Sequence, residues 1–161
     1  MLTNTLASVV VAQAIAHHQI PMKENLEQVM CLAEAIYHEA RGKEEPLAGM
    51  YAVGLVVKNR VESESYPNTY CSVVHQPKQF SYRNAGQPET NLVSLYTPDA
   101  DRLWWSVTAA IDVSNGKIED FTEGSLHYVN FDKIRFKPNW LQRMNVVVKI
   151  GSHSFLKEKG E

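Results

Sequence analysis

The chain is organised around residues 25–42, which read NLEQVMCLAEAIYHEARG. Asn25 can cap the first turn of a helix, with Gln28 three residues later as in a capping box. Gly42 is the residue type that most easily ends one. Apolar residues recur between them at spacings of three and four, which predicts one buried helical stripe: Val29, Leu32, Ala33, Ile36 and Ala40. We therefore expect a helix from about Asn25 to Arg41.

Glu39 falls in the last turn of this expected helix. Free carbonyl groups and the negative end of the helix dipole disfavour an ionised carboxylate there. If the side chain also faces a partly dry cleft, it is biased towards the protonated form that a general acid needs. Most glutamates near helix ends are solvated surface groups, so these residues alone do not establish catalysis.

Composition limits the function classes. The chain has 161 residues, of which 44% are hydrophobic and 21% charged, with a net charge of −2. This length and balance are typical of one globular domain with a real core. A chain with this net charge has no overall positive potential that would attract nucleic acid. We expect a monomer without a nucleic-acid partner.

The two cysteines, Cys31 and Cys71, form neither a disulfide framework nor a zinc-ribbon spacing. Cys31 lies in the apolar helix, where a free cysteine usually behaves as a small buried hydrophobe. A Cys31–Cys71 bridge is the alternative if the protein works outside the cytoplasm. Both readings stay open at this point.

The first segment, residues 1–24, contains an apolar run at residues 6–16. The run is shorter than the ~20 residues that span a bilayer, and residues 1–5 lack the Lys or Arg of a signal peptide. We expect a first helix that packs on the domain, with no stable membrane insertion. An export or anchor segment is the alternative.

Further elements follow from periodicity and turn residues. Helical patterns run from Leu47 to about Val61 and from Thr97-Pro98 to Asn115-Gly116. Residues 125–130 and 145–155 are rich in β-branched and aromatic residues and are expected as strands, paired antiparallel, with Gly151 at a bulge or turn. We therefore expect an α+β, mainly α, fold with a small antiparallel β element near the C-terminus. The catalytic domain should span residues 25–156, and a charged tail residues 157–161.

The sequence contains no complete motif for a zinc hydrolase or for a nucleophilic serine. His38 to Gly42 departs from the HExxH zinc motif at its fifth position, although His75, His127 and His153 could still meet in space. No GxSxG marks a nucleophilic serine. We therefore expect no metal and no cofactor, and a lone glutamate that protonates a leaving oxygen, as in glycosidic bond cleavage. Glu34, five residues earlier, points to a different face and does not form a pair with Glu39.

Several motifs resemble one family when taken in order. They are YHEARG at 37–42, GMYAV at 49–53, VVKNRV at 56–61, Tyr66-Pro67, Val73-Val74, QFS at 79–81, His127-Tyr128, PNW at 138–140 and IGSHSF at 150–155. Together they cover about residues 29–156. The chain resembles the SleB/CwlJ-type cell-wall hydrolases, the catalytic domain of spore-cortex-lytic enzymes.

This resemblance implies a lysozyme-like, lytic-transglycosylase-like helical fold and cleavage of peptidoglycan glycan strands between N-acetylmuramic acid and N-acetylglucosamine. It makes Glu39 the single catalytic acid/base and a lytic transglycosylase the expected activity, in which the 6-hydroxyl of the muramic acid attacks. An internal nucleophile lessens the need for a second carboxylate. The candidates for sugar positioning are Gln79, Ser81, His127 and Tyr128, and those for stacking are Phe80 and Trp140.

The chain departs from the family pattern beside the catalytic motif. Lys43-Glu44 looks like an insertion, and Glu45-Pro46 takes the place usual for the Glu after Arg-Gly. The alternatives are a non-catalytic wall-binding or assembly protein and a metal-dependent amidase or peptidase. We expect action on the wall, in the periplasm or exterior. Without a convincing signal peptide the protein could stay cytoplasmic until released, as a phage endolysin does; a bacterial remodelling enzyme is the other reading.

Overall fold

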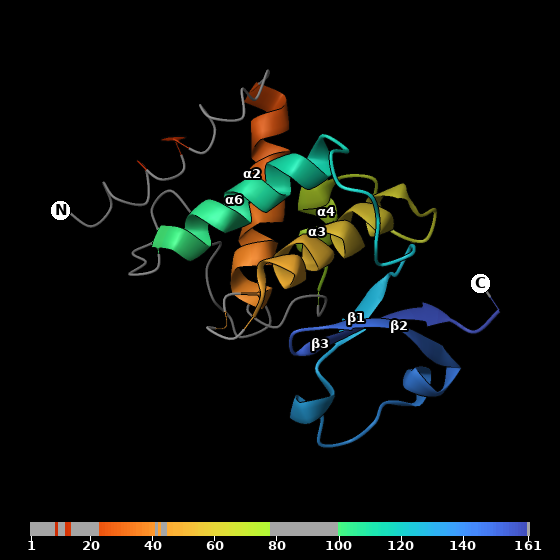
Figure 1. Cartoon of the computed structure of the whole chain (residues 1–161). Coiled ribbons are helices and arrows are strands. Elements are labelled where there is room, and N and C mark those ends of the chain that lie inside the picture. Colours follow the sequence, from red (N-terminus) through yellow and green to blue (C-terminus); the bar gives the residue numbers. More distant parts are fainter. Residues whose placement is uncertain are drawn as a thin grey trace.

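The computed structural model describes Val9, Ala12, Gln13 and residues 23–40, 42, 45–77 and 100–160. Within these ranges the helices are α2 (Lys23–Glu39), α3 (Leu47–Glu62), α4 (Tyr70–Val74) and α6 (Ala100–Ser114). The strands β1 (His127–Val129), β2 (Met144–Ile150) and β3 (His153–Glu158) follow (Figure 1). Short 3₁₀ turns at Phe131–Lys133 and Asn139–Arg143 lie between β1 and β2.

The helices pack around α3, which contacts α2, α4, α6 and the sheet. In Figure 1, α6 crosses α2, and the sheet lies below α3. The predicted stripe of α2 is in the core, where Leu32 and Ile36 are fully buried. They pack with α3 and with Leu103 and Ile111 of α6. α3 is buried on most sides, and it therefore forms the centre of the domain.

Cys31 and Cys71 form a disulfide that joins α2 to α4. The Cys71 backbone N–H also donates to the Gln28 side-chain oxygen at 3.1 Å. Of the two readings left open by the sequence, the bridged one is therefore correct. The cross-link closes a stretch of 40 residues that contains the whole of α3.

The sheet has three antiparallel strands in the order β1-β3-β2. The segment expected as strand at 145–155, with a bulge or turn at Gly151, is a hairpin, because Gly151 turns the chain with φ +55°. Ile150 pairs with His153 across this turn, and β1 pairs with β3. Phe155 of β3 is fully buried against Ala52 and Val56 of α3, and this contact attaches the sheet to the helices.

The structure confirms the mainly helical fold with a small antiparallel sheet near the C-terminus and corrects several bounds. α2 begins at Lys23 and ends at Glu39, and Gly42 does not adopt a left-handed φ. β3 continues to Glu158, so the first two residues of the expected tail belong to the sheet. The expected start of α6 at Thr97-Pro98 lies outside the described residues.

Most of the first segment, residues 1–24, also lies outside the described residues. Val9, Ala12 and Gln13 are helical but exposed, with 47% of Val9 accessible. The packing of the whole apolar run on the domain stays a prediction, because its other residues lie outside the described ones. Among the described residues, no helix has the length and apolar character needed to cross a bilayer.

Candidate active site

Glu39 is the last residue of α2 and is half-buried. The next residue, Ala40, still donates its backbone N–H to the Ile36 carbonyl at 2.9 Å, so the last helical turn is closed at this point. Glu34 is almost fully buried on the same helix. Five residues correspond to a rotation of about 140° around a helix, so Glu34 and Glu39 lie on different faces. Glu39 therefore stands at the helix end, as the sequence predicted.

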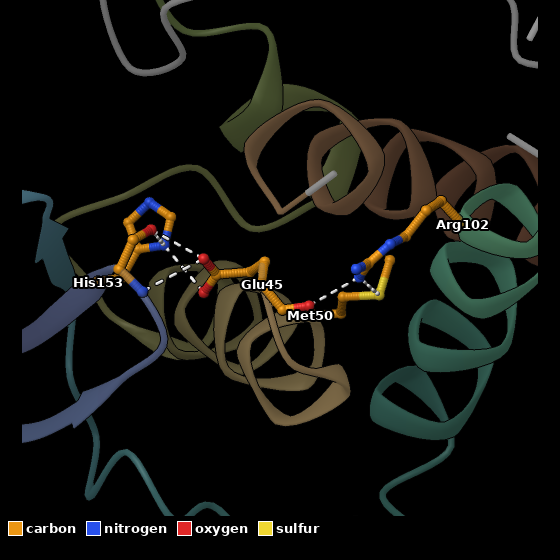
Figure 2. Close-up of polar contacts among 5 residues, drawn as sticks. Glu45, Met50, Arg102 and His153 are labelled. Atoms are coloured by element: carbon orange, nitrogen blue, oxygen red, sulfur yellow. Dashed lines mark hydrogen bonds and ion pairs between the residues drawn. The ribbon is translucent and has the colours of Figure 1, made fainter. Parts of the chain in front are cut away.

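Glu45 follows this helix end and has several bonding partners. Its side chain is buried, and one carboxylate oxygen accepts the Ser152 backbone N–H at 3.3 Å and the Ser152 hydroxyl at 2.8 Å. The other oxygen lies 3.3 Å from Nδ1 of His153. Figure 2 shows this carboxylate directed at the hairpin between β2 and β3. A buried carboxylate needs such partners, because burial of an unpaired charge is costly.

The Glu45 backbone makes contacts on the opposite side. Its carbonyl accepts from Nη1 of Arg102 at 2.8 Å, and the same nitrogen lies 3.8 Å from Sδ of Met50 (Figure 2). Its N–H donates to the Gly42 carbonyl at 2.9 Å. We call Glu45, Arg102, Ser152 and His153 the Glu45 joint. The joint ties the exit from α2 to α6 and to the hairpin.

Two glycines make room for the Glu45 carboxylate. A Cβ at Gly49 would lie 2.5 Å from Oε1 of Glu45. A Cβ at Gly151 would collide with the same oxygen and lie 2.6 Å from Cδ of Pro46. The family pattern included Glu45, but the sequence did not predict the contact of its carboxylate with the hairpin. The signal that could have found it is the pair of glycines, one on α3 and one directly before Ser152.

Tyr128 lies beside the Glu45 joint. Its ring meets the His153 ring edge-on with centroids 5.2 Å apart, and it lies 5.8 Å from the Phe155 ring. The structure therefore connects one predicted sugar-positioning residue, through His153, to the region where α2 ends.

His127 and Trp140 lie together elsewhere, with ring centroids 5.5 Å apart. His127 pairs with Leu156, three residues along β3 from His153, which corresponds to a separation of about 10 Å. Burial lowers the pKa of His127, the charge of Arg60 lowers it further, and Glu158 opposes both effects. The imidazole is therefore neutral at neutral pH. His127 and Trp140 line one hollow together with Tyr128, so Tyr128 borders both this hollow and the joint.

The other predicted site residues, Gln79, Phe80 and Ser81, lie outside the described residues. The three histidines considered as metal ligands do not meet, since His127 contacts Trp140, His153 contacts Glu45, and His75 caps the exposed end of α4. Within the part of the chain that the structure describes, no group of three His, Cys, Asp or Glu side chains could hold a metal ion.

Comparison with known proteins assigns the family. Residues 44–156 match the family model described as Cell Wall Hydrolase. The chain belongs to the cell wall hydrolase family. The match begins five residues after Glu39, so it covers the Glu45 joint and the sheet but not the end of α2.

The cell wall hydrolase is similar to curated spore cortex-lytic enzymes. It is 34% identical to that of Bacillus cereus over 86% of this chain and 47% of the relative. It is 30% identical to that of Halalkalibacterium halodurans over 84% of this chain and 36% of the relative. The chain thus spans about half the length, or less, of these curated relatives.

Two solved structures share the fold. The catalytic domain of the Bacillus cereus SleB protein is 33% identical, with a TM-score of 0.63 over 81% of this chain and 89% of that domain. The catalytic domain of the germination-specific lytic transglycosylase SleB from Bacillus anthracis is 31% identical, with a TM-score of 0.66 over 86% of this chain and 100% of that domain.

Proposed function

We propose that this cell wall hydrolase cleaves peptidoglycan glycan strands between N-acetylmuramic acid and N-acetylglucosamine, as a lytic transglycosylase with Glu39 as its acid and base. The observation that carries the proposal is the length of the structural match. The chain spans the full length of a solved catalytic domain that is named a lytic transglycosylase.

The position of Glu39 suits the first step. At the end of α2 the free carbonyls disfavour an ionised carboxylate, so the side chain can keep a proton and give it to the glycosidic oxygen. The bond between C1 of the muramic acid and that oxygen breaks through an oxocarbenium-like transition state. The 6-hydroxyl of the same sugar then attacks C1, and the Glu39 carboxylate takes its proton. The products are a 1,6-anhydro end and a free N-acetylglucosamine end.

The Glu45 joint has a positioning role in this proposal. Its carboxylate accepts the Ser152 N–H and hydroxyl and lies 3.3 Å from Nδ1 of His153, so it is already engaged inside the fold. By tying Gly42 and Arg102 to the hairpin, it holds the exit of α2 against the sheet. Among the candidates that the structure describes, Tyr128 lies beside the joint and would position the sugar near Glu39. Gln79 and Ser81 remain candidates for positioning and Phe80 for stacking.

We further propose that the protein acts as a monomer on the wall, in the periplasm or at the cell exterior. The Cys31–Cys71 disulfide supports this setting, because disulfides persist in oxidising compartments and are rare in the cytosol.

The test is lysis of purified sacculi by wild type and by the Glu39→Gln variant. General acid–base catalysis contributes about 10²- to 10⁴-fold, so the variant should lose at least that factor in rate with an unchanged circular dichroism spectrum and melting temperature. Glu62→Gln on the exposed end of α3 is the matched control and should keep full activity. Full activity of Glu39→Gln would refute the assignment.

Product analysis separates the alternatives. Mass spectrometry of the released fragments should find 1,6-anhydro ends, whereas reducing muramic acid ends would indicate plain hydrolysis. Sacculus binding without released fragments would instead indicate a non-catalytic wall-binding protein. Loss of activity on chelation would indicate a metal-dependent amidase or peptidase.

A further inference from the structure

Residues 131–137 connect β1 to the second 3₁₀ turn, and their sequence is FDKIRFK. In Figure 1 this part of the chain lies beyond the sheet, on the side away from α2 and α6. We call residues 131–137 the basic tip. None of them lines the hollow that contains His127, Tyr128 and Trp140. The tip is therefore a separate surface of the molecule.

The basic tip presents an aromatic side chain to water. Phe136 is 86% exposed, the highest value among the large apolar side chains that the structure describes. Phe131, at the start of the tip, is 39% exposed. Apolar area of this kind favours any partner that removes it from water. Because the fold buries so little of the Phe136 ring, the ring is available to a partner without any rearrangement of the core.

The backbone of the tip is held at both ends. At its start, the Asn130 side chain accepts the Asp132 N–H at 3.0 Å, and the Asn130 carbonyl accepts the Lys133 N–H at 3.2 Å. After its end, Pro138 has φ −61°, and its carbonyl accepts the Leu141 N–H at 3.1 Å. A segment fixed in this way loses less conformational entropy when it binds than a free loop does.

The charge of the chain is distributed unevenly around the tip. Residues 131–149 contain five Lys or Arg and one Asp, and all six side chains are exposed. The rest of the chain contains eleven Lys or Arg and 17 Asp or Glu. Within the described part of the chain, none of the five cations forms an ion pair. A net positive segment on a net negative chain is attracted to an anionic surface in one orientation, with the tip foremost.

The combination of charge and an exposed ring distinguishes between anionic partners. A soluble polymer of phosphate groups would pair with the cations but leave the Phe136 ring in water. A bilayer with anionic lipids satisfies both, because basic side chains lie among the headgroups while an apolar side chain enters the boundary with the acyl chains. The tip therefore fits a lipid surface better than a dissolved polyanion.

We propose that the basic tip binds reversibly to the surface of a bilayer that contains anionic phospholipids. Phe136 enters the boundary below the headgroups, and Lys133, Arg135 and Lys137 lie near the lipid phosphates. This binding goes beyond the proposed glycan cleavage and does not depend on Glu39. It would hold the enzyme at the membrane side of the wall.

The test is co-sedimentation of the full chain with vesicles of phosphatidylcholine, with and without phosphatidylglycerol. We expect binding to the anionic vesicles alone, and weaker binding at high salt because the attraction is screened. Lys137→Ala should weaken binding about fivefold, and Phe136→Ala about tenfold or more. The matched controls are Lys117→Ala, an exposed lysine after α6, and Trp105→Ala, a 41% exposed ring on α6. Both should bind as wild type does, and circular dichroism should show that every variant is folded.

Three results with vesicles would overturn the proposal: no binding to anionic vesicles, equal binding to neutral vesicles, or unchanged binding of Phe136→Ala. Wild type is also mixed with soluble polyphosphate. Binding to polyphosphate without binding to vesicles would assign the tip to a dissolved polyanion and would also contradict the proposal.

Lysis of purified sacculi, which contain no lipid, separates this proposal from the proposed function. Phe136→Ala should lyse sacculi as wild type does, and a loss of lysis would place the tip in the glycan-binding site and overturn the membrane role. If wild type binds anionic vesicles but does not lyse sacculi, the proposed function fails and the membrane surface stands. If it lyses sacculi but does not bind vesicles, the reverse holds.

Discussion

The Glu45 carboxylate and the His153 imidazole lie 3.3 Å apart, although 108 residues separate them in the sequence. Both side chains are almost entirely buried, with 5% and 11% exposed. This contact joins the loop after α2 to the first residue of β3. It connects the sheet to the segment that follows α2.

Replacement of Glu45 by Ala should therefore destabilise the protein. Loss of one partner of a buried pair typically costs about 3–5 kcal/mol, because the other partner is left without compensation. Urea denaturation measures the loss, and Glu64→Ala at an exposed position is the control that should change little. Glu45→Gln, which keeps the shape and can still accept from Ser152, should cost less than Glu45→Ala. Equal stability of wild type and Glu45→Ala would contradict the role of the joint.

Gly151→Ala should destabilise the protein through two effects. The residue has φ +55°, which costs an L-residue roughly 1–2 kcal/mol, and the new Cβ would also lie 2.6 Å from Cδ of Pro46. Gly116→Ala is the matched control, because Gly116 has φ +67° with nothing within 4 Å of its Cβ position. The difference between the two losses of unfolding free energy isolates the cost of crowding Glu45. We expect Gly151→Ala to lose more unfolding free energy than Gly116→Ala. Equal losses would argue against close packing at the joint.

Removal of the Cys31–Cys71 bridge should lower the unfolding free energy by about 4 kcal/mol. The physical reason is that the bridge closes a separation of 40 residues and so restricts the unfolded chain. Denaturation of wild type with and without a thiol reductant measures the effect. The Cys31→Ser/Cys71→Ser double variant should have the same unfolding free energy as reduced wild type, and the reductant should not change it. A reductant-sensitive double variant would show that the effect arises elsewhere.

Tyr51 should make stability fall in alkaline solution. Burial, and then the hydrogen bond from its hydroxyl to Asp112 at 2.9 Å and the charge of that carboxylate, raise the pKa of Tyr51 from 10.0 to about 12. The folded state therefore favours the neutral phenol. Its contribution is complete below pH 10 and is lost as the pH rises towards about 12, because the unfolded chain releases the proton first.

Denaturation midpoints of wild type and Tyr51→Phe between pH 9 and pH 12 test this linkage. The variant lacks the ionisable group and should show a shallower decline than wild type over the upper part of this range. Parallel curves would mean that Tyr51 does not titrate differently in the folded and unfolded states.

Local patterns predicted much of this domain. The three- and four-residue spacing of Leu32 and Ile36 predicted the buried face of α2, and the β-branched segments predicted strands. These features depend on neighbours along the chain, so a single sequence contains them. Of the bulge or turn expected at Gly151, the structure shows a turn, because Gly151 at positive φ turns the chain back on itself. The composition of residues 145–155 alone did not decide between the two.

The sequence by itself determined that an apolar-faced helix carries a glutamate in its last turn, and that ordered motifs from Tyr37 to Phe155 resemble one family of wall enzymes. Only the tertiary structure decided that Glu45 meets Ser152 and His153 and that Cys31 reaches Cys71. It also placed Tyr128 against His153 of the joint and His127 against Trp140. The reason is that periodicity and capping act within a few residues, whereas a buried charge finds its partners only when distant segments pack together.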